Sequence, residues 1–372
     1  MSYSKEVISK QVDKIKETFK SWLGEHKEDY FDNNAVGLGC FNYKPYDVAW
    51  AVTKQCNLKC AHCSISAGSA GKDELSTEEG LSFIEDVANL GPVKFVFTGG
   101  EALLRKDIFE LIEYATSLNM QVEVATNGTL IDDNVAKRLK NAGVYEVAIS
   151  MDGIGKIHDN IRGIKGTFDK AVRAIKACKK AGLKVHFHTT IFKINISELS
   201  RIVDFAEQLQ VDRIYIGTLV PVGRGQKISH VCLSGEEVKQ IFNFIVERQP
   251  KTRVWLRPVC PQFWAFLEAE NLLDGDNGHK FIGCTAGITS FHILPNGDVD
   301  LCAELPLKVG NIKQQPFTTI IKNDIFKKFR NREIKGTCGN CKYLDICGGC
   351  RARAFAAYGS PLAEDPVCFL AK

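Results

Sequence analysis

The sequence has no long hydrophobic run and no block of charge of one sign. Its first residues lack the apolar core of a secretion signal, and no stretch is long enough to cross a bilayer, so we expect a cytoplasmic protein without a membrane partner. Its 48 basic and 44 acidic residues are mixed without interleaved aromatics, which gives nucleic acid binding no support. No internal repeat and no low-complexity tract interrupts the chain, which excludes solenoids and fibres.

Cysteine is what the sequence has in excess, with 14 among 372 residues. In a reducing compartment so many thiols are best explained if most of them bind metal. One group lies at 56–63, and seven more crowd the last quarter, at Cys284, Cys302, Cys338, Cys341, Cys347, Cys350 and Cys368. This division suggests one large domain and a smaller one, which the length allows.

The first group places Cys56, Cys60 and Cys63 on one short loop. Three thiolates can hold three irons of a 4Fe–4S cluster and leave the fourth iron open to another ligand. A structural zinc ion normally needs four protein ligands, and the loop offers only His62 besides the thiols, so zinc is the less favoured alternative.

Short apolar runs alternate with helical patterns through the middle of the chain. The runs predict strands at Val48–Thr53, Val93–Phe97, Gln121–Ala125, Glu146–Ser150, His186–Ile191 and Arg213–Thr218. Helices are expected near 76–90, 106–118, 131–142, 168–182 and 197–209, with an amphipathic helix at 5–23 that packs on the main domain. Repeated βα units predict a parallel sheet, open or rolled into a barrel. A helical connector, broken at Gln249-Pro250, is expected at about 234–275.

Small, polar or liganding residues follow the first four predicted strands. These residues are Cys56–Cys63, Thr98-Gly99-Gly100-Glu101, Thr126-Asn127-Gly128 and Ser150-Met151-Asp152-Gly153. In parallel α/β folds the ligand site lies at the carboxyl ends of the strands. The sequence therefore predicts a single site at this edge.

With these motifs in place, the chain resembles the radical S-adenosylmethionine (SAM) superfamily, whose signature is Cys-x3-Cys-x2-Cys after the first strand of a partial (βα)6, TIM-like barrel. Cys56, Cys60 and Cys63 match it. The resemblance implies an anaerobic enzyme of oxidoreductase or lyase type, in which the open iron binds SAM. Reductive cleavage of SAM then gives a deoxyadenosyl radical that abstracts hydrogen from a substrate carbon. Reduced ferredoxin or flavodoxin is the implied electron donor.

The same resemblance implies contacts to SAM. Gly99, Gly100 and Glu101 match the family's Gly-Gly-Glu stretch, whose backbone contacts the amino group. Ser150 and Arg162 match positions that contact the ribose and the carboxylate, and a guanidinium suits a carboxylate. Nucleoside contacts are expected at Asn127 and Leu219. Ser64 stands where many relatives have Tyr, and His62 is expected to pack over the cluster.

The last quarter resembles the SPASM extension, which carries auxiliary iron–sulfur clusters. A hairpin with a Pro295-Asn296-Gly297 turn is expected between Cys284 and Cys302. The resemblance implies an outer 4Fe–4S cluster on Cys338, Cys341, Cys347 and Cys368, and an inner one on Cys284, Cys302, Cys350 and, as the eighth thiolate, Cys260. Without Cys260 the inner cluster would have an open iron, and the number of auxiliary clusters is one or two.

Two details qualify the SPASM interpretation. The family pattern has three residues before Cys350, where this chain has two. A zinc ribbon remains the alternative, although its cysteine pairs normally lie farther apart in the sequence. The remaining thiols, Cys40, Cys178 and Cys232, are interpreted as small apolar residues.

Four domains follow: an N-terminal helical extension at 1–45, the barrel at 46–225, a helical connector at 226–280 and the SPASM domain at 281–372. Within the SPASM enzymes, the nearest resemblance is to those that modify tetrapyrrole side chains in alternative haem and nitrite-reductase haem pathways. It rests on the segments 260–263, 307–312, 348–354 and 363–366. Decarboxylation or trimming of side chains would need cations, for which the candidates are Arg224, Lys308, Arg351 and Arg353.

Two alternatives stay open. A maturase of a ribosomally made peptide, forming a thioether or carbon–carbon crosslink, or of another cofactor, would share many of these motifs. Such peptide maturases often carry a winged-helix module, for which about 45 residues before the barrel leave too little room. A non-catalytic iron–sulfur electron carrier would not need the Gly-Gly-Glu stretch or Arg162.

Overall fold

The computed structural model describes residues 5–25, 47–91, 93–273 and 283–370. Cys40 and most of the predicted link between the first helix and the barrel lie outside the described residues. Among the described helices, none combines the length and the apolar character that a membrane-crossing segment needs.

One ten-stranded sheet organises the molecule, in the order β10-β9-β8-β1-β2-β3-β4-β5-β6-β7. β1 to β7 are parallel neighbours, β8 runs parallel to β1, and β9 and β10 are antiparallel additions. The strands are β1 Asp47–Ala51, β2 Lys94–Thr98, β3 Gln121–Thr126, β4 Glu146–Ser150, β5 Lys184–Ile191, β6 Arg213–Thr218, β7 Trp255–Pro258, β8 Ser290–Ile293, β9 Asp298–Cys302 and β10 Leu305–Asn311. The predicted α/β fold with a parallel sheet is confirmed.

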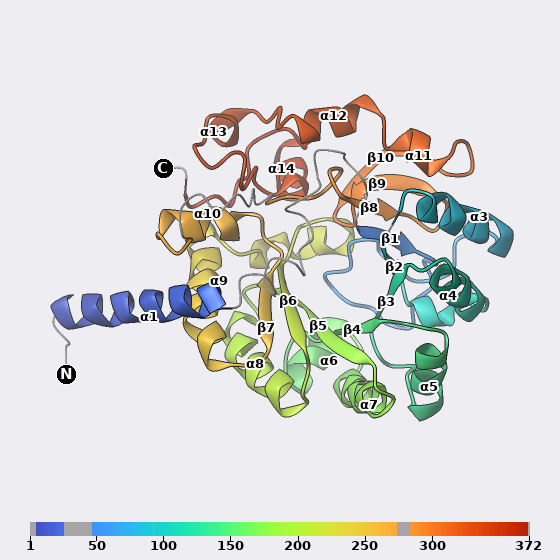
Figure 1. Ribbon diagram of the computed structural model, residues 1–372, viewed down its shortest axis with the longest axis horizontal. Helices are drawn as coiled ribbons and strands as arrows, with labels where there is room; N and C mark the ends of the chain where they lie inside the picture. Colours follow the sequence, from blue (N-terminus) through green and yellow to red (C-terminus); the bar gives the residue numbers. More distant parts are fainter. Residues whose placement is uncertain (1–4, 26–46, 92, 274–282, 371–372) are drawn as a thin grey trace.

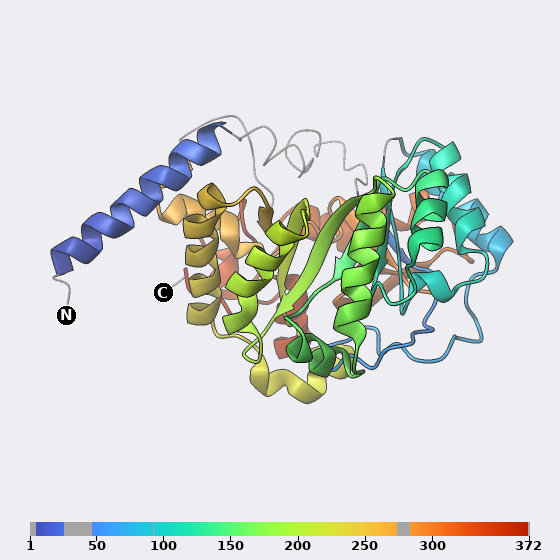
Figure 2. The same cartoon turned by 90° about the horizontal axis from the view of Figure 1, so that it is seen from below.

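Helices surround the curved sheet on its outer side (Figures 1 and 2). Those of the barrel are α3 Thr77–Ala88, α4 Ile108–Ser117, α5 Asp133–Asn141, α6 Lys156–Arg162, α7 Thr167–Lys180, α8 Leu199–Gln208 and α9 Gly235–Arg248. The others are α1 Lys5–Glu25, α10 Gln262–Ala269, α11 Phe317–Ile320, α12 Asp324–Arg330, α13 Gly336–Gly339 and α14 Arg351–Tyr358.

Alternation along each strand separates the two faces of the sheet. In β1, Val48 and Trp50 point to the helices, and the Trp50 ring lies 5.8 Å from that of Phe83 on α3. Ala49 and Ala51 point inward. The outer face is therefore a continuous apolar core, and small inward side chains leave space inside the barrel.

The predicted helical connector is wrong at one point, because residues 255–258 form β7, parallel to β6. The helix before it does end near Pro250, as predicted. A strand of four residues is too short to show a period of two, so the sequence does not distinguish β7 from the predicted connector. The short helix α6 was not predicted either.

The N-terminal helix packs on the barrel, as predicted. Phe19 and Leu23 are buried, and Trp22 packs against Trp255 in a tilted arrangement with ring centroids 5.5 Å apart. Lys16 Nζ forms an ion pair with Glu270 at 2.6 Å. The rest of α1 projects beyond the barrel (Figure 2).

The C-terminal region joins the barrel through the sheet itself. β8 pairs with β1 in register, with Ala49 opposite His292. β8 and β9 form the predicted hairpin around Gly297, and the turn between β9 and β10 consists of Ala303 and Glu304. Strands from both sides of the boundary predicted at 280/281 thus belong to one continuous sheet. The four domain limits stay a prediction.

Candidate active site and metal centres

A cavity of about 340 Å³ lies at the carboxyl ends of the barrel strands. All three cysteines of the first loop line it, and so do six of the seven predicted SAM contacts: Gly99, Gly100, Asn127, Ser150, Arg162 and Leu219. Ala303 and Glu304, from the turn between β9 and β10, lie at the same cavity. The strand ends that the sequence singled out therefore meet in one place, although the individual roles stay a prediction.

The cysteine loop is held through its backbone carbonyl groups, which Arg224 and Gly223 contact. Arg224 Nε donates to the Cys60 carbonyl at 2.8 Å and Nη1 donates to the Ala67 carbonyl at 2.5 Å. Gly223 packs so closely that a Cβ there would lie 2.1 Å from the Ser64 carbonyl oxygen. Arg224 therefore lines the cavity and holds the loop through Nε and Nη1, and its predicted contact with a substrate carboxylate stays a prediction.

The Gly-Gly-Glu stretch packs against the same loop. The Gly100 N–H donates to the Thr53 carbonyl at 2.7 Å, and a Cβ on Gly100 would lie 2.2 Å from the Gln55 carbonyl oxygen. The Glu101 carboxylate is buried outside the cavity, where it accepts from Thr126 Oγ1 at 2.7 Å and from the Asn127 N–H at 2.8 Å. Glu101 thus positions the end of β3, and only its backbone can serve a ligand.

Asn127 connects the third strand end to the cysteine loop. Its Nδ2 donates to Asn57 Oδ1 at 2.9 Å, and Asn57 Nδ2 donates to Thr129 Oγ1 at 2.8 Å. This pair of bonds fixes the loop between Cys56 and Cys60. Asn57 was not predicted as a site residue, although it lies inside the cysteine motif.

A buried charge pair lies behind the loop. Arg162 Nη2 contacts Asp152 Oδ2 at 2.6 Å, and Arg162 Nη1 lies 3.8 Å from Cys60 Sγ. Burial opposes ionisation of Asp152, but Arg162 outweighs it and lowers the carboxyl pKa. Arg162 was predicted to bind the carboxylate of SAM, and in the structure its guanidinium is paired with Asp152. The same guanidinium faces the Cys60 sulfur.

His62 lies beside this pair. Its Nε2 is 3.5 Å from Asp152 Oδ2, and its ring centroid is 6.0 Å from that of Phe192. Burial lowers the His62 pKa to about 4, so the ring is neutral at physiological pH. Packing over the loop, as predicted, fits this geometry.

The four cysteines assigned to the outer cluster surround one small cavity: Cys338, Cys341, Cys347 and Cys368. Backbone N–H groups point at three of the sulfurs, from Tyr343 to Cys341 at 3.4 Å, from Gly349 to Cys347 at 3.3 Å, and from Asp365 to Cys338 at 3.3 Å. Such donors stabilise thiolate or cluster charge.

The inner group brings together Cys284, Cys302 and Cys350. Burial raises the pKa of Cys302 well above its usual value, and the charges of Glu304 and of the other two thiols act in the same direction. Cys260 Sγ lies 3.5 Å from Thr218 Oγ1 instead, so its role as a fourth ligand stays a prediction.

Sulfur spacing distinguishes clusters from zinc. In the described part of the chain, no three cysteine sulfurs lie within 4.8 Å of one another. A tetrahedral zinc ion with Zn–S bonds of about 2.3 Å holds its sulfurs less than about 4 Å apart. The donor sets therefore fit iron–sulfur clusters better than single zinc ions.

Three other predicted substrate cations are engaged within the protein. Arg351 is buried and donates to the Pro361 and Ala363 carbonyls at 3.0 and 2.6 Å. Arg353 is buried and pairs with Asp365 at 2.8 Å, and the exposed Lys308 pairs with Asp298 at 2.6 Å. None of these three residues lines the cavity of about 340 Å³, so their contact with a substrate stays a prediction.

Asp365, which lies in the segment 363–366, has a linking role in this region that the sequence did not reveal. Besides Arg353, it accepts from Gln262 Nε2 at 2.6 Å and from the Cys350 N–H at 2.7 Å. It therefore ties both cysteine groups to α10. Cys178 is buried in α7, where burial raises its pKa to about 12, which confirms its apolar interpretation.

Family models recognise both parts of the chain. One described as the radical SAM superfamily matches residues 50–206, and one described as an iron–sulfur cluster-binding domain, SPASM, matches residues 284–350. The AdoMet-dependent heme synthase of Methanosarcina barkeri is 35% identical over 337 residues, which cover 87% of this chain and 96% of that protein.

Further relatives and a solved structure agree with this match. The Fe-coproporphyrin III synthase of M. barkeri is 36% identical over 87% of this chain and 88% of that protein. Mycofactocin maturase MftC of Mycobacterium tuberculosis is 32% identical over 87% and 83%. The crystal structure of Streptococcus suis SuiB bound to S-adenosylmethionine has a TM-score of 0.70 at 20% identity, covering 88% of this chain and 77% of that one, which shows a shared fold.

Proposed function

The chain belongs to the radical SAM superfamily and carries a SPASM domain, and on that premise we propose that it decarboxylates or trims tetrapyrrole side chains in haem biosynthesis. The observation that carries the proposal is the 35% identity with a heme synthase over nearly the full length of both chains. We place the reaction in an anaerobic cytoplasm, as an oxidoreductase with reduced ferredoxin or flavodoxin as donor.

A radical SAM enzyme with a SPASM domain uses a SAM-binding 4Fe–4S cluster together with auxiliary clusters. Cys56, Cys60 and Cys63 would hold the first cluster, which supplies the electron that cleaves SAM to methionine and a hydrogen-abstracting deoxyadenosyl radical. The loop fits this group, because backbone N–H groups lie 3.4 Å from Cys56 Sγ and 3.3 Å from Cys63 Sγ, and Arg162 faces Cys60.

The chain's own residues shape the reaction space. Ala49, Ala125 and Ala148 leave room inside the barrel, and Ser150 and Asn127 line the same cavity. Cys302 lies two residues before Glu304, which lines the cavity. The inner cysteine group is therefore beside the reaction space, a position that suits an electron acceptor for oxidative decarboxylation.

The test is an anaerobic assay of reconstituted protein with dithionite and SAM. About twelve irons per chain would indicate two auxiliary clusters and about eight would indicate one. We expect deoxyadenosine formation to rise with Fe-coproporphyrin III or a sirohaem-derived tetrapyrrole, with a product that has lost carbon dioxide or an acetate-derived fragment. The matched control is Cys60→Ser, which should cleave no SAM. If no tetrapyrrole stimulates cleavage by the wild-type protein, the proposal is rejected.

Peptide maturation is the second candidate, supported by the 32% identity with MftC. The same assay distinguishes it, since a peptide from a neighbouring gene would stimulate SAM cleavage where tetrapyrroles do not. A non-catalytic electron carrier would form no deoxyadenosine with either substrate class.

A further inference from the structure

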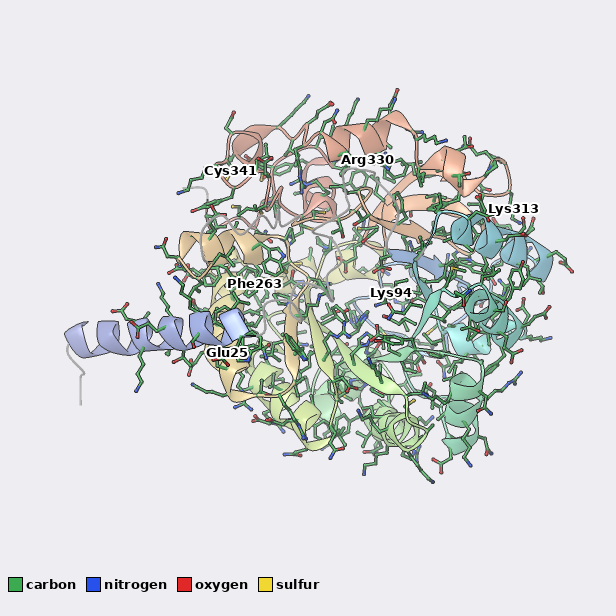
Figure 3. The ribbon with its side chains drawn as sticks, in the orientation of Figure 1. Glu25, Lys94, Phe263, Lys313, Arg330 and Cys341 are labelled. Carbon is green, nitrogen blue, oxygen red and sulfur yellow. The ribbon has the colours of Figure 1, made fainter. Side chains whose placement is uncertain are left out.

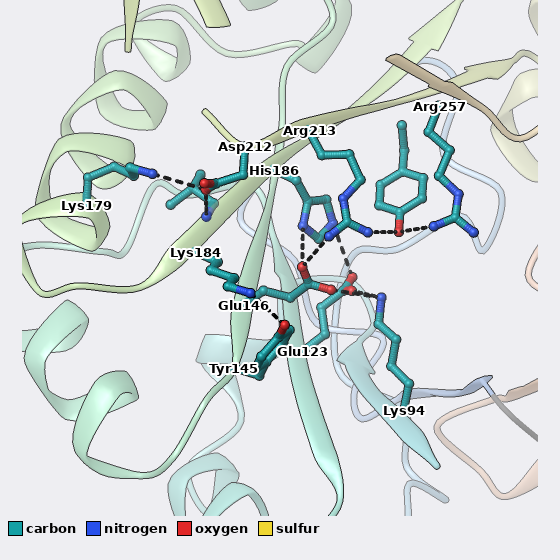
Figure 4. Close-up of polar contacts among 12 residues, drawn as sticks. Lys94, Glu123, Tyr145, Glu146, Lys179, Lys184, His186, Asp212, Arg213 and Arg257 are labelled. Atoms are coloured by element: carbon teal, nitrogen blue, oxygen red, sulfur yellow. Dashed lines mark hydrogen bonds and ion pairs between the residues drawn. The ribbon is translucent and has the colours of Figure 1, made fainter. Parts of the chain in front are cut away.

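Charged side chains fill the barrel interior below the cavity, toward the amino-terminal ends of the strands. They come from six different strands: Asp47, Lys94, Glu123, Glu146, His186 and Arg213. Figure 4 shows the last five of these side chains, and Lys94 is also labelled inside the barrel in Figure 3. Buried charges are costly unless they are paired or coordinate a metal. The group therefore needs an explanation beyond packing.

His186 is the anomaly in this group. The ring is fully buried, and neither nitrogen makes a hydrogen bond. Nε2 lies 3.5 Å from Glu123 Oε1, and Nδ1 lies 3.5 Å from Glu146 Oε2. These separations exceed a normal hydrogen bond. They are close to the roughly 3.3 Å between two ligands of one tetrahedral ion with bonds of about 2.0–2.1 Å.

His188 adds a third donor. It follows His186 by two residues on the same face of β5, and one ligand atom from each of Glu123, His186 and His188 lies within 4.8 Å of the others. Within the described residues its side chain makes ring contacts but no hydrogen bond or ion pair. Its side chain is exposed, so the ring nitrogens are open to a ligand.

We propose that Glu123, His186 and His188 bind one zinc ion, whose fourth position faces the cavity and takes water or an anionic group. His188 itself lines that cavity, so the site has an entry path. Two histidines and one carboxylate form a three-ligand set with an open position, as in catalytic zinc sites. Among divalent ions that this donor set also suits, such as ferrous iron, zinc binds more tightly.

The surrounding groups match what such a ligand set requires. Glu146 faces the second nitrogen of His186, as the carboxylate does in a carboxylate–histidine–metal arrangement. Glu146 is itself held by Lys94 at 3.0 Å and by Arg213 at 3.2 Å, and Lys94 also pairs with the other oxygen of Glu123. The Tyr215 ring packs on both imidazoles, at 4.9 Å from His186 and 5.2 Å from His188.

A closed ion-pair network is the competing explanation. In this network, a protonated His186 bridges the Glu123 and Glu146 carboxylates. Burial favours the neutral ring, but the two carboxylates outweigh burial and raise the His186 pKa. That network has no use for His188, which approaches no carboxylate closely enough for an ion pair in the described part of the chain. Removing His188 should therefore separate the two explanations.

The experiment measures zinc on the holoprotein with its clusters already reconstituted, after incubation with zinc and desalting. We expect about one zinc per chain, with an X-ray absorption shell of nitrogen and oxygen near 2.0–2.1 Å and without sulfur near 2.3 Å. A sulfur shell would mean zinc in a cysteine site, and either that result or less than about a tenth of an equivalent of zinc overturns the proposal.

The variant His188→Gln should lose the zinc and keep its full iron content. His292→Gln is the matched control, since His292 lines the same cavity but does not belong to the ligand group. It should keep both metals. Zinc retained by His188→Gln would overturn the proposal, and unchanged iron content and circular dichroism would show that the variant is folded. Because zinc is counted without substrate, this result is independent of the proposed tetrapyrrole chemistry.

Discussion

The two ends of the barrel interior are built by different means. At the carboxyl end, the cysteine loop is held by carbonyl groups, by close glycine contacts and by Arg224, and its histidines His62 and His158 are neutral, with pKa values lowered to about 4 by burial. At the amino end, the strands are linked by ion pairs, and His186 lies between the Glu123 and Glu146 carboxylates. Carbonyl contacts and close glycine packing thus hold the cysteine loop, with the single Arg162–Asp152 pair behind it, whereas a network of several charges links the strands at the amino end.

The largest effect should come from breaking the charged end. Lys94→Met leaves the Glu123 and Glu146 carboxylates buried without their shared cation, which should cost about 3–5 kcal/mol of unfolding free energy. Denaturant unfolding of the reconstituted protein measures this. The control Lys180→Met removes the exposed ion pair with Asp133 and should change nothing measurable. Equal effects of the two substitutions would refute the contrast.

The next effect should appear at the carboxyl end as lost activity rather than lost stability. Gly223→Ala places a Cβ against the Ser64 carbonyl and must displace the cysteine loop, so SAM cleavage should fall about 100-fold, equivalent to about 2.7 kcal/mol. Gly182→Ala has the same positive φ requirement and no atom within 4 Å of the new Cβ. If this control loses as much activity as Gly223→Ala, close packing on the loop is not the cause.

A smaller effect should come from pH. His158 accepts from the Asp152 N–H at 3.2 Å, and burial followed by the charge of Arg162 lowers its pKa to about 4. A lowered histidine pKa contributes stability that is fully present above the unfolded value of about 6.5 and is lost as the pH falls toward 4.

Between pH 6.5 and 4 we expect this loss to amount to about 2.5 kcal/mol, because the His158 pKa lies about 2.5 units below its unfolded value, each unit is worth about 1.4 kcal/mol, and most of the difference is lost in that range. His158→Gln keeps an acceptor for Asp152 without a titrating ring, so it should flatten the stability curve between pH 6.5 and 4. Unfolding free energies across that range measure the slope, and an unchanged slope in the variant would show that His158 is not its source.

The sequence revealed the carboxyl end far better than the amino end. Cysteine spacing and the Gly-Gly-Glu stretch are local patterns that directly follow predicted strands, and the match to heme synthases confirms the resemblance that they indicated. The charged end is spread over six strands, one or two residues in each. Lys94 and Glu123 look like ordinary residues of half-buried strands until the register brings them together.

Side-chain direction limited the remaining predictions. Arg351 and Arg353 follow the last clustered cysteine as predicted substrate cations, yet both turn into the C-terminal region, toward carbonyl groups and Asp365. β7 escaped prediction because four residues carry too little periodicity. For β7 the deciding contact is its pairing with β6, which lies far away in the sequence.

The pairing of β8 with β1 has a consequence for how this protein divides into modules. A truncated protein that ends before residue 281 would lack β8, and β1 would keep only β2 as a neighbour. The free side of β1 would then expose unpaired backbone groups, and such a sheet edge promotes pairing with other chains and aggregation. The C-terminal region therefore covers the sheet edge of the barrel. We expect the two regions that the family models recognise to fold and unfold as one cooperative unit.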